Sequence, residues 1–130
     1  MPKQHYVIVV ADDDSATNAL LRAVLSSEGY ELRCCFTGAE AERVIRRVIP
    51  DVAIVDMQME VRDAGLRLLK TVRTNPRTAN LAVILCSADE RFLNDHRDDI
   101  DAYGAAIVTK PFELDHLLAT VERVLESTVA

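Results

Sequence analysis

The sequence predicts an α/β domain in which five parallel strands form one doubly wound sheet with helices on both faces. Short runs rich in β-branched residues alternate five times with segments whose apolar residues recur at helical spacing. Such strict alternation favours a parallel sheet, because right-handed crossovers return every strand in the same direction and place helices on both faces. The 130 residues contain no internal repeat or linker, so we expect a single domain over 1–130.

The predicted strands are short and apolar, as is typical of strands that are buried on both faces. The first run is mostly valine and isoleucine and leads into three consecutive aspartates. The third run leads in the same way into Asp56. The five predicted strands span 6–11, 30–35, 52–55, 81–85 and 105–108.

The predicted helices follow from apolar stripes and from the residues that end them. The first helix stops at Gly29, the second at Pro50 and the third before the pair at 75–76, all residues that commonly end helices. The last helix begins near Leu114 and has the clearest period. Its stripe consists of Leu114, Leu117, Leu118, Val121, Val124 and Leu125.

The segment between the fourth and fifth strands has a poor helical pattern. Phe92, Leu93 and Ile100 lie among aspartate, arginine and asparagine residues. Few apolar residues give a helix little to bury, so we expect a thinly anchored and mobile helix there.

Charge and cysteine usage narrow the functional classes. The 15 basic and 21 acidic residues give a net charge of -6, which argues against a surface for nucleic acid or anionic membranes. No apolar stretch approaches the roughly 18 residues of a membrane span, and the N-terminus lacks the apolar run of a signal peptide. Cys34, Cys35 and Cys86 lack the spacing of a zinc site. We expect buried free thiols and therefore a reducing, cytoplasmic location.

Polar residues follow four of the five predicted strands. The first strand ends in the aspartates at 12–14, the third in Asp56, the fourth in Ser87 and the fifth in Lys110. In a doubly wound sheet, ligands bind outside the carboxyl ends of the strands, where the strand order reverses. We therefore expect these side chains to meet at one edge of the sheet.

The residue types at this edge indicate phosphoryl chemistry. Crowded carboxylates repel each other and need a cation, and a site of oxygen ligands alone favours Mg²⁺. Asp56 is the candidate nucleophile, because an aspartate can form an acyl phosphate. Lys110 is expected to neutralise the transferred charge, and Ser87 to donate a hydrogen bond to a phosphoryl oxygen.

Five segments, in this order and spacing, resemble the receiver domain of response regulators in two-component signalling. They are the run VVADDDS at 9–15, the segments 50–56 and 64–69, the pair Ser87-Ala88, and Lys110-Pro111-Phe112. The resemblance covers nearly the whole chain. It implies the flavodoxin-like receiver fold and a phosphoprotein whose phosphorylation switches partner binding, as in stand-alone chemotaxis regulators.

The resemblance also implies a role for each site residue. Asp12 and Asp13 match the acidic pair that holds Mg²⁺, and Asp56 matches the phosphoacceptor and a third metal ligand. The backbone carbonyl of Gln58 would complete the metal shell. Ser87 matches the switch hydroxyl and Lys110 the lysine that meets the phosphoryl group. The Lys110-Pro111 peptide bond would be cis.

Partners and activity follow from the same resemblance. The phosphoryl donor would be a histidine kinase or a histidine phosphotransfer protein. The domain would catalyse only its own phosphorylation and dephosphorylation, without being an enzyme otherwise. It would signal to a downstream protein or a fused output domain, and it could form a homodimer through the fourth helix, fifth strand and fifth helix, roughly 90–125.

Three positions depart from the family pattern. Glu60 stands where a proline is usual, four residues after the phosphoacceptor, and Gly65 lies one residue later than is common. Either the loop varies harmlessly, or the charge of Glu60 weakens phosphorylation or metal affinity. Ile107 replaces the usual Tyr or Phe switch. Coupling then takes another route, or the signal is read mainly from the loop after Ser87.

Other functions stay open at this point. One is a receiver-like protein-binding module that works without phosphorylation, as the three departures suggest. Another is an aspartyl-phosphate hydrolase, which needs a general acid two residues after the nucleophile, where this chain has Gln58. A cofactor binder of the flavodoxin type would want a phosphate loop after the first strand, but the aspartates at 12–14 would repel phosphate.

Overall fold

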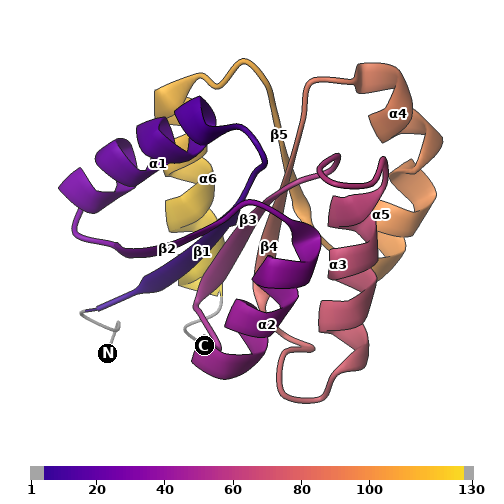
Figure 1. Ribbon diagram of the computed structural model, residues 1–130, viewed down its shortest axis with the longest axis horizontal. Coiled ribbons are helices and arrows are strands. Elements are labelled where there is room, and N and C mark those ends of the chain that lie inside the picture. Colours follow the sequence, from indigo (N-terminus) through magenta and orange to yellow (C-terminus); the bar gives the residue numbers. More distant parts are fainter. Residues whose placement is uncertain (1–4, 128–130) are drawn as a thin grey trace.

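The strands form one parallel sheet in the order β2-β1-β3-β4-β5 in the computed structural model, which describes residues 5–127 (Figure 1). Every neighbouring pair of strands is parallel, so the predicted fold class is confirmed. The strands are β1 (Val7–Ala11), β2 (Glu31–Cys35), β3 (Val52–Asp56), β4 (Ala82–Ser87) and β5 (Ala106–Thr109).

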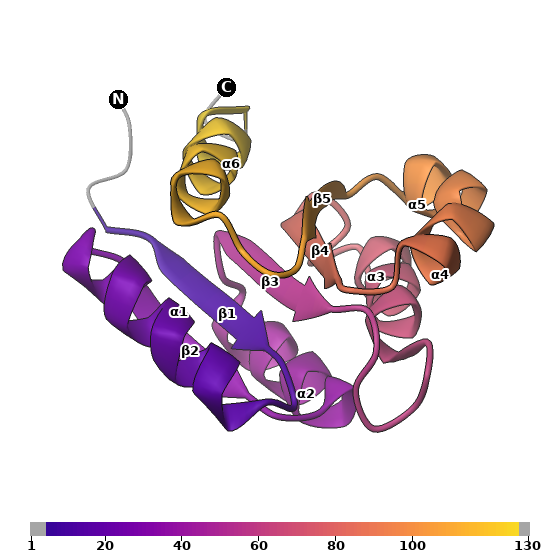
Figure 2. The same ribbon diagram turned by 90° about the horizontal axis from the view of Figure 1, so that it is seen from above.

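The helices cover both faces of the sheet, so the chain buries two separate apolar layers (Figures 1 and 2). The apolar stripes of α1 and α6 pack on one face, and those of α2 to α5 on the other. The helices are α1 (Ser15–Ser27), α2 (Gly38–Val48), α3 (Ala64–Thr74), α4 (Glu90–Asp95), α5 (Arg97–Tyr103) and α6 (Leu114–Ser127).

The segment between β4 and β5 contains two short helices, where the sequence predicted one. The break lies at His96, whose backbone has φ -110° and ψ 12°. The few apolar residues of this segment, Phe92, Leu93 and Ile100, are all buried in the layer that α2 and α3 also cover, while its mobility stays a prediction. Figure 2 shows α4 and α5 beside α3, so this segment is part of the core.

One half-buried side chain, Arg73 near the end of α3, contacts the two segments that precede β4 and β5. The guanidinium of Arg73 donates hydrogen bonds to the carbonyl oxygens of Tyr103 (2.6 Å) and Gly104 (2.6 Å) before β5. It also donates to those of Ala79 (3.2 Å) and Leu81 (2.6 Å) before β4. Burial lowers the pKa of Arg73. This side chain therefore fastens α3 to the amino ends of two strands.

The cysteines are free thiols, as predicted. Cys35 and Cys86 are buried and Cys34 is half-buried. Burial raises the pKa of Cys35 to about 11 and also raises that of Cys86. These thiols are therefore protonated and unreactive near neutral pH.

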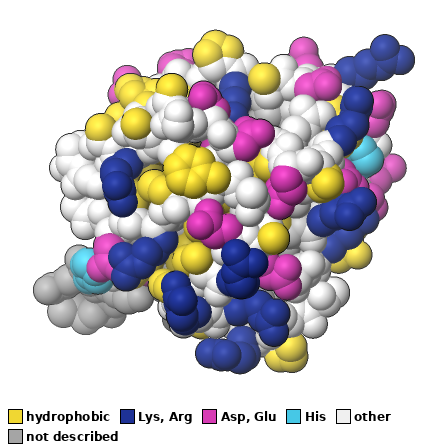
Figure 3. Space-filling view, viewed as in Figure 1, with side chains coloured by type: hydrophobic (Ala, Val, Ile, Leu, Met, Phe, Trp, Pro, Cys, Tyr) yellow, Lys and Arg dark blue, Asp and Glu magenta, His cyan; other side chains and the backbone are white. Residues whose placement is uncertain are grey.

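The surface carries charges of both signs. Figure 3 shows acidic and basic side chains interspersed over one face, with Lys and Arg more frequent along its lower part, where α2 lies. Arg43, Arg46 and Arg47 on α2 are all exposed. Within 5–127, none of the helices is both long and apolar enough to cross a membrane.

The sheet order fixes where loops from distant parts of the chain meet. β1 lies between β2 and β3, and the chain crosses one face through α1 and the other through α2. The strand order thus reverses at the pair β1 and β3, which is where a doubly wound sheet opens a crevice. Ala11 is paired with Val55, so the two strands end side by side.

Candidate functional site

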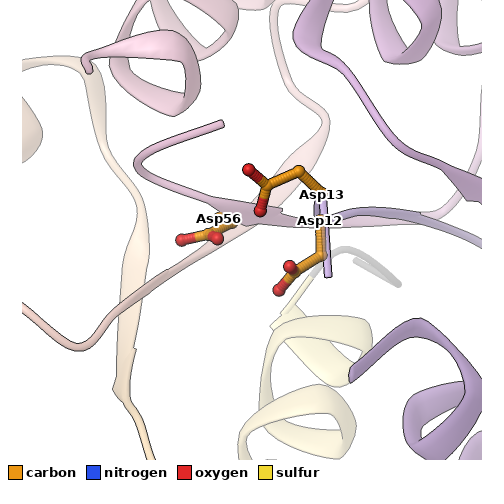
Figure 4. Close-up of side chains that lie close together, drawn as sticks. All are labelled: Asp12, Asp13 and Asp56. Carbon is orange, nitrogen blue, oxygen red and sulfur yellow. The ribbon is translucent and has the colours of Figure 1, made fainter. Parts of the chain in front are cut away.

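Three carboxylates meet in the crevice between β1 and β3. Asp12 and Asp13 directly follow β1, and Asp56 is the last residue of β3 (Figure 4). One oxygen from each lies within 4.8 Å of the other two. Asp12 is only 2% exposed and Asp56 is half-buried, whereas Asp13 faces solvent. The predicted convergence of these three residues is thus present in the structure.

The turn that carries Asp12 is held by hydrogen bonds from two sides. The Asp12 N–H donates to the carbonyl of Cys35 at the end of β2 (3.1 Å). The buried amide of Asn18 in α1 donates from Nδ2 to the Asp12 carbonyl (2.6 Å). The Asp12 carboxylate in turn accepts from the Asp14 N–H (2.9 Å). Asn18 could not be recognised from the sequence, because its partners lie outside α1.

Asp14 stands apart from the cluster of Asp12, Asp13 and Asp56. It is exposed and caps α1, where its side chain accepts hydrogen bonds from Ala16 N (3.4 Å) and Thr17 Oγ1 (2.7 Å). The bond from Thr17 is the main cause that lowers the pKa of Asp14.

Lys110 supplies the positive charge at this site. Its Nζ lies 2.7 Å from Asp12 Oδ2 and 3.1 Å from Asp56 Oδ2. The Lys110 N–H donates to the Ser87 carbonyl (2.9 Å), and the Lys110-Pro111 bond is cis. The side chain thus reaches from the end of β5 to the carboxylates that follow β1 and end β3.

The electrostatics show that one lysine does not balance the carboxylates. Burial raises the pKa of Asp56, which Lys110 opposes and the Asp12 carboxylate reinforces. Burial alone would lower the pKa of Lys110, but its hydrogen bond to Asp12 and the charge of Asp56 outweigh burial and raise it. Lys110 therefore stays charged, while the site keeps surplus negative charge that a cation would relieve.

Ser87 lies at the end of β4, one residue beyond the partner of Asp56 in the strand pairing. It is buried, and its hydroxyl donates to the Asp89 carbonyl (3.1 Å) and accepts from the Asp89 N–H (3.1 Å). The Asp89 side chain caps α4 by accepting from Phe92 N (3.0 Å). A hollow of about 240 Å³ opens beside these residues, lined by Ser87, Ala88, Glu90, Thr109 and Lys110. Ser87 thus faces the loop to α4, within the same edge as Lys110.

The loop after Asp56 is pressed against α3. A β-carbon on Gly65 would lie 2.4 Å from the Asp56 carbonyl oxygen and 2.6 Å from Met57 Cα, so only glycine fits there without a shift. The Gly65 N–H donates to the Met57 carbonyl (2.9 Å). Gln58 is half-buried, and its N–H lies 3.5 Å from Asp56 Oδ1. The close approach of α3 therefore constrains the backbone of Asp56 and Met57.

Glu60 contacts the first turn of α2. Its carboxylate accepts hydrogen bonds from Gly38 N (2.7 Å) and Ala39 N (3.1 Å). Burial acts to raise the pKa of Glu60, but these bonds and one from its own backbone outweigh burial and lower it. Ile107 is partly buried and packs against the layer formed by α2 to α5.

Comparison with known proteins places the chain in a family. The family model described as response regulator receiver domain matches residues 8–122. The phosphate regulon transcriptional regulatory protein PhoB of Rhizobium meliloti is 34% identical over 119 residues, which are 91% of this chain and 51% of that protein. The response regulator MprA of Mycobacterium leprae is 30% identical over 121 residues, or 93% of this chain and 51% of its own length. The chain thus spans about half the length of these relatives.

Solved structures agree with this assignment. A putative response regulator from Chloroflexus aurantiacus superposes with a TM-score of 0.84 at 30% identity, covering 95% of this chain and 99% of that one. The receiver domain of the Francisella response regulator 1452 gives a TM-score of 0.83 at 28% identity, covering 95% and 98%. The predicted resemblance is confirmed: this chain belongs to the family of response regulator receiver domains.

Proposed function

We propose that this receiver domain is a phosphorylation-dependent switch in which Asp56 accepts the phosphoryl group in the presence of Mg²⁺. The observation that supports this most directly is the position of Lys110, whose Nζ contacts both Asp56 Oδ2 (3.1 Å) and Asp12 Oδ2 (2.7 Å). A lysine at this distance can exchange a carboxylate oxygen for an oxygen of the transferred group. The charge it supplies is therefore already in place before transfer.

The donor set fits Mg²⁺. Asp12, Asp13 and Asp56 offer only oxygen atoms, which hard divalent cations prefer, and their oxygens lie within 4.8 Å of one another. Receiver domains bind Mg²⁺ at an acidic pocket, and we assign that role here to these three aspartates and the backbone carbonyl of Gln58. When bound, the ion neutralises the carboxylates and the oxygens of the incoming phosphoryl group.

The reaction itself is carried by one carboxylate. Asp56 attacks the phosphorus of a phosphohistidine on a histidine kinase or a histidine phosphotransfer protein. A P–O bond to Asp56 forms as the P–N bond breaks, and the leaving imidazole takes a proton from solvent. The signal ends by hydrolysis: water attacks the phosphorus of phosphorylated Asp56 and releases phosphate and the free carboxylate. The domain needs no other catalytic activity for this role.

The signal is read most directly at the loop after β4. Ser87 now exchanges two hydrogen bonds with the backbone of Asp89 at the start of α4. If its hydroxyl turns to a phosphoryl oxygen, both bonds are lost and the entry to α4 is released. Ile107 has no ring to rotate in step with this change. We therefore propose that the loop 87–89 and α4 transmit the signal.

We also propose which partners receive the signal and where the domain works. The chain is a signalling module, and its relatives of about twice this length include proteins named as transcriptional regulators. A downstream protein or a fused output domain would receive the signal, and α4, α5, β5 and α6 offer the surface for it or for a second copy. Buried free thiols suit a reducing compartment, so we place the domain in the cytoplasm.

Two other functions are less well supported. A binding module without phosphorylation would not need Lys110 between two carboxylates. A hydrolase would need a general acid near the nucleophile, and the amide of Gln58 cannot supply a proton to a leaving group.

Intact-mass measurement tests the proposal. The wild type, incubated with acetyl phosphate and Mg²⁺, is expected to gain the mass of one phosphoryl group, and Asp56→Asn is expected to gain none. A wild type that stays unmodified would support the phosphorylation-independent module. A gain that persists in Asp56→Asn would assign the acceptor to another residue.

A further inference from the structure

Glu60 connects the loop that follows Asp56 to α2, which precedes that loop in the sequence by a whole strand. The residue lies in the loop between β3 and α3, and its two carboxylate oxygens accept from the N–H groups of Gly38 (2.7 Å) and Ala39 (3.1 Å). These are the first two residues of α2. Gly38 and Glu60 are separated by 22 residues in the sequence.

Other backbone N–H groups around the start of α2 have their hydrogen-bond partners within 36–40. Thr37 Oγ1 accepts from the Glu40 N–H (3.0 Å), and Glu40 Oε1 accepts from the Phe36 N–H (2.8 Å). The first N–H groups of a helix have no partner within the helix itself. Glu60 supplies one for Gly38 and Ala39, and a carboxylate is also favoured there by the helix dipole.

The same loop has two further backbone hydrogen bonds, one to α3 and one within the loop itself. The Gly65 N–H donates to the Met57 carbonyl (2.9 Å), and the Met59 N–H donates to the Val61 carbonyl (3.1 Å). Gln58 lies between the Met57 anchor and the Glu60 anchor. Its backbone can move little unless one of the two anchors is released.

We propose that Glu60 is a positioning residue, which clamps the loop 57–60 onto α2 and so holds the Gln58 carbonyl where the metal site needs it. A proline at this place would stiffen the loop through its fixed φ. Here two charge-assisted hydrogen bonds to another element do so instead. The inference rests on the proposed function for its metal-binding part, but the clamp itself is a property of the protein without metal.

Three variants separate this role from simple helix capping. Glu60→Ala removes both bonds of the clamp, and Glu60→Gln keeps one acceptor oxygen without the charge. Thr37→Ala is the matched control, because it removes a cap from the same helix but leaves the loop untouched. Mg²⁺ affinity is measured by isothermal titration calorimetry, and amide hydrogen exchange is measured in a chelator.

The clamp predicts different patterns for the variants. In Glu60→Ala, the amides of Gly38 and Ala39 are expected to exchange about tenfold faster, as for the loss of a hydrogen bond to a charged group. Mg²⁺ affinity is expected to fall roughly tenfold, the usual effect of losing a residue that orients a metal ligand. Glu60→Gln is expected to lie between this variant and the wild type. Thr37→Ala should speed exchange at Glu40 and leave Mg²⁺ affinity unchanged.

The outcomes also separate the clamp from the proposed function. Unchanged Mg²⁺ affinity in Glu60→Ala, or an equal loss in Thr37→Ala, would overturn the positioning role while the metal site stands. Unchanged exchange at Gly38 and Ala39 would overturn the clamp itself. A wild type that binds no Mg²⁺ would overturn the metal site, and with it the purpose assigned to the clamp.

Discussion

At the scale of single residues, the site depends on a few side chains whose positions are over-determined. Lys110 is shared by Asp12 and Asp56, and Asp12 is fixed in turn by the amide of Asn18. Gly65 lies against the backbone of the acceptor itself. Each of these residues can be replaced alone, and its contacts predict whether stability rises or falls.

Gly65 is the residue where size matters most. In Gly65→Ala, the new methyl group would lie 2.4 Å from the Asp56 carbonyl oxygen, which belongs to the backbone and must shift. We expect a loss of about 1–3 kcal/mol in the free energy of unfolding, typical of overpacking. Chemical denaturation measures this. Gly38→Ala is the control, because its nearest neighbour would be 3.4 Å away at the end of the Glu60 side chain. Equal stability of the Gly65 variant and the wild type would contradict the close packing.

The charge of Asp56 predicts a pH dependence of stability. Because burial raises the pKa of Asp56, the folded protein holds this proton more tightly than the unfolded chain does. Ionisation of Asp56 therefore costs stability, and the cost develops as the pH rises through the interval between the ordinary value of 3.8 and the raised pKa. In a chelator, Asp56→Asn is expected to melt higher than the wild type at pH 7, on the order of a few degrees. The gain should shrink as the pH approaches 3.8. A lower melting temperature in Asp56→Asn at pH 7 would contradict this reasoning.

At the scale of elements, the loops are held together by contacts between segments far apart in the sequence. Arg73 in α3 bonds to carbonyls 30 and 31 positions further along, at the end of α5. Glu60 does the same between the β3-α3 loop and α2. Both side chains bond to backbone groups at the ends of other elements, where such groups lack partners in their own element.

Replacement of Arg73 tests this kind of contact. Arg73→Met keeps an unbranched side chain but leaves four carbonyl oxygens without their donor. We expect it to lower the free energy of unfolding by about 2–4 kcal/mol, since hydrogen bonds to charged groups are the stronger ones. Arg67→Met is the control: Arg67 pairs with Asp63 at 2.8 Å on the surface, and its loss should cost less than about 1 kcal/mol. Equal effects of the two variants in chemical denaturation would contradict the role of Arg73.

The difference between local patterns and contacts of distant segments explains which features could be predicted from the sequence. The strands and the outer limits of most helices follow from local apolar patterns, as in the continuous run of β1 and the stripe of α6. The break at His96 does not, because neither glycine nor proline marks it in the sequence. Asn18 and Arg73 were not marked out by the sequence, since a polar residue in a helix is usually solvated. Glu60 was marked out as a departure from the family pattern, but its contact with α2 could not be predicted.

At the scale of the whole molecule, the topology makes the site. Lys110 and Asp12 are 98 residues apart in sequence and meet because parallel strands place all their carboxyl ends at one edge. This is why the three aspartates and Lys110 could be predicted to converge from the order of elements alone. The direction of each side chain could not be predicted, as Ser87 bonded to Asp89 illustrates.

The identity of the phosphorylated residue tests the central claim most directly. Borohydride reduces an acyl phosphate of aspartate to homoserine, which marks the acceptor in a peptide map. After treatment of the full chain with acetyl phosphate and Mg²⁺, we expect homoserine at position 56 and nowhere else, and none when the metal is chelated. A mark at Asp12, Asp13 or another carboxylate, or a mark at position 56 that forms equally well without metal, would contradict the account.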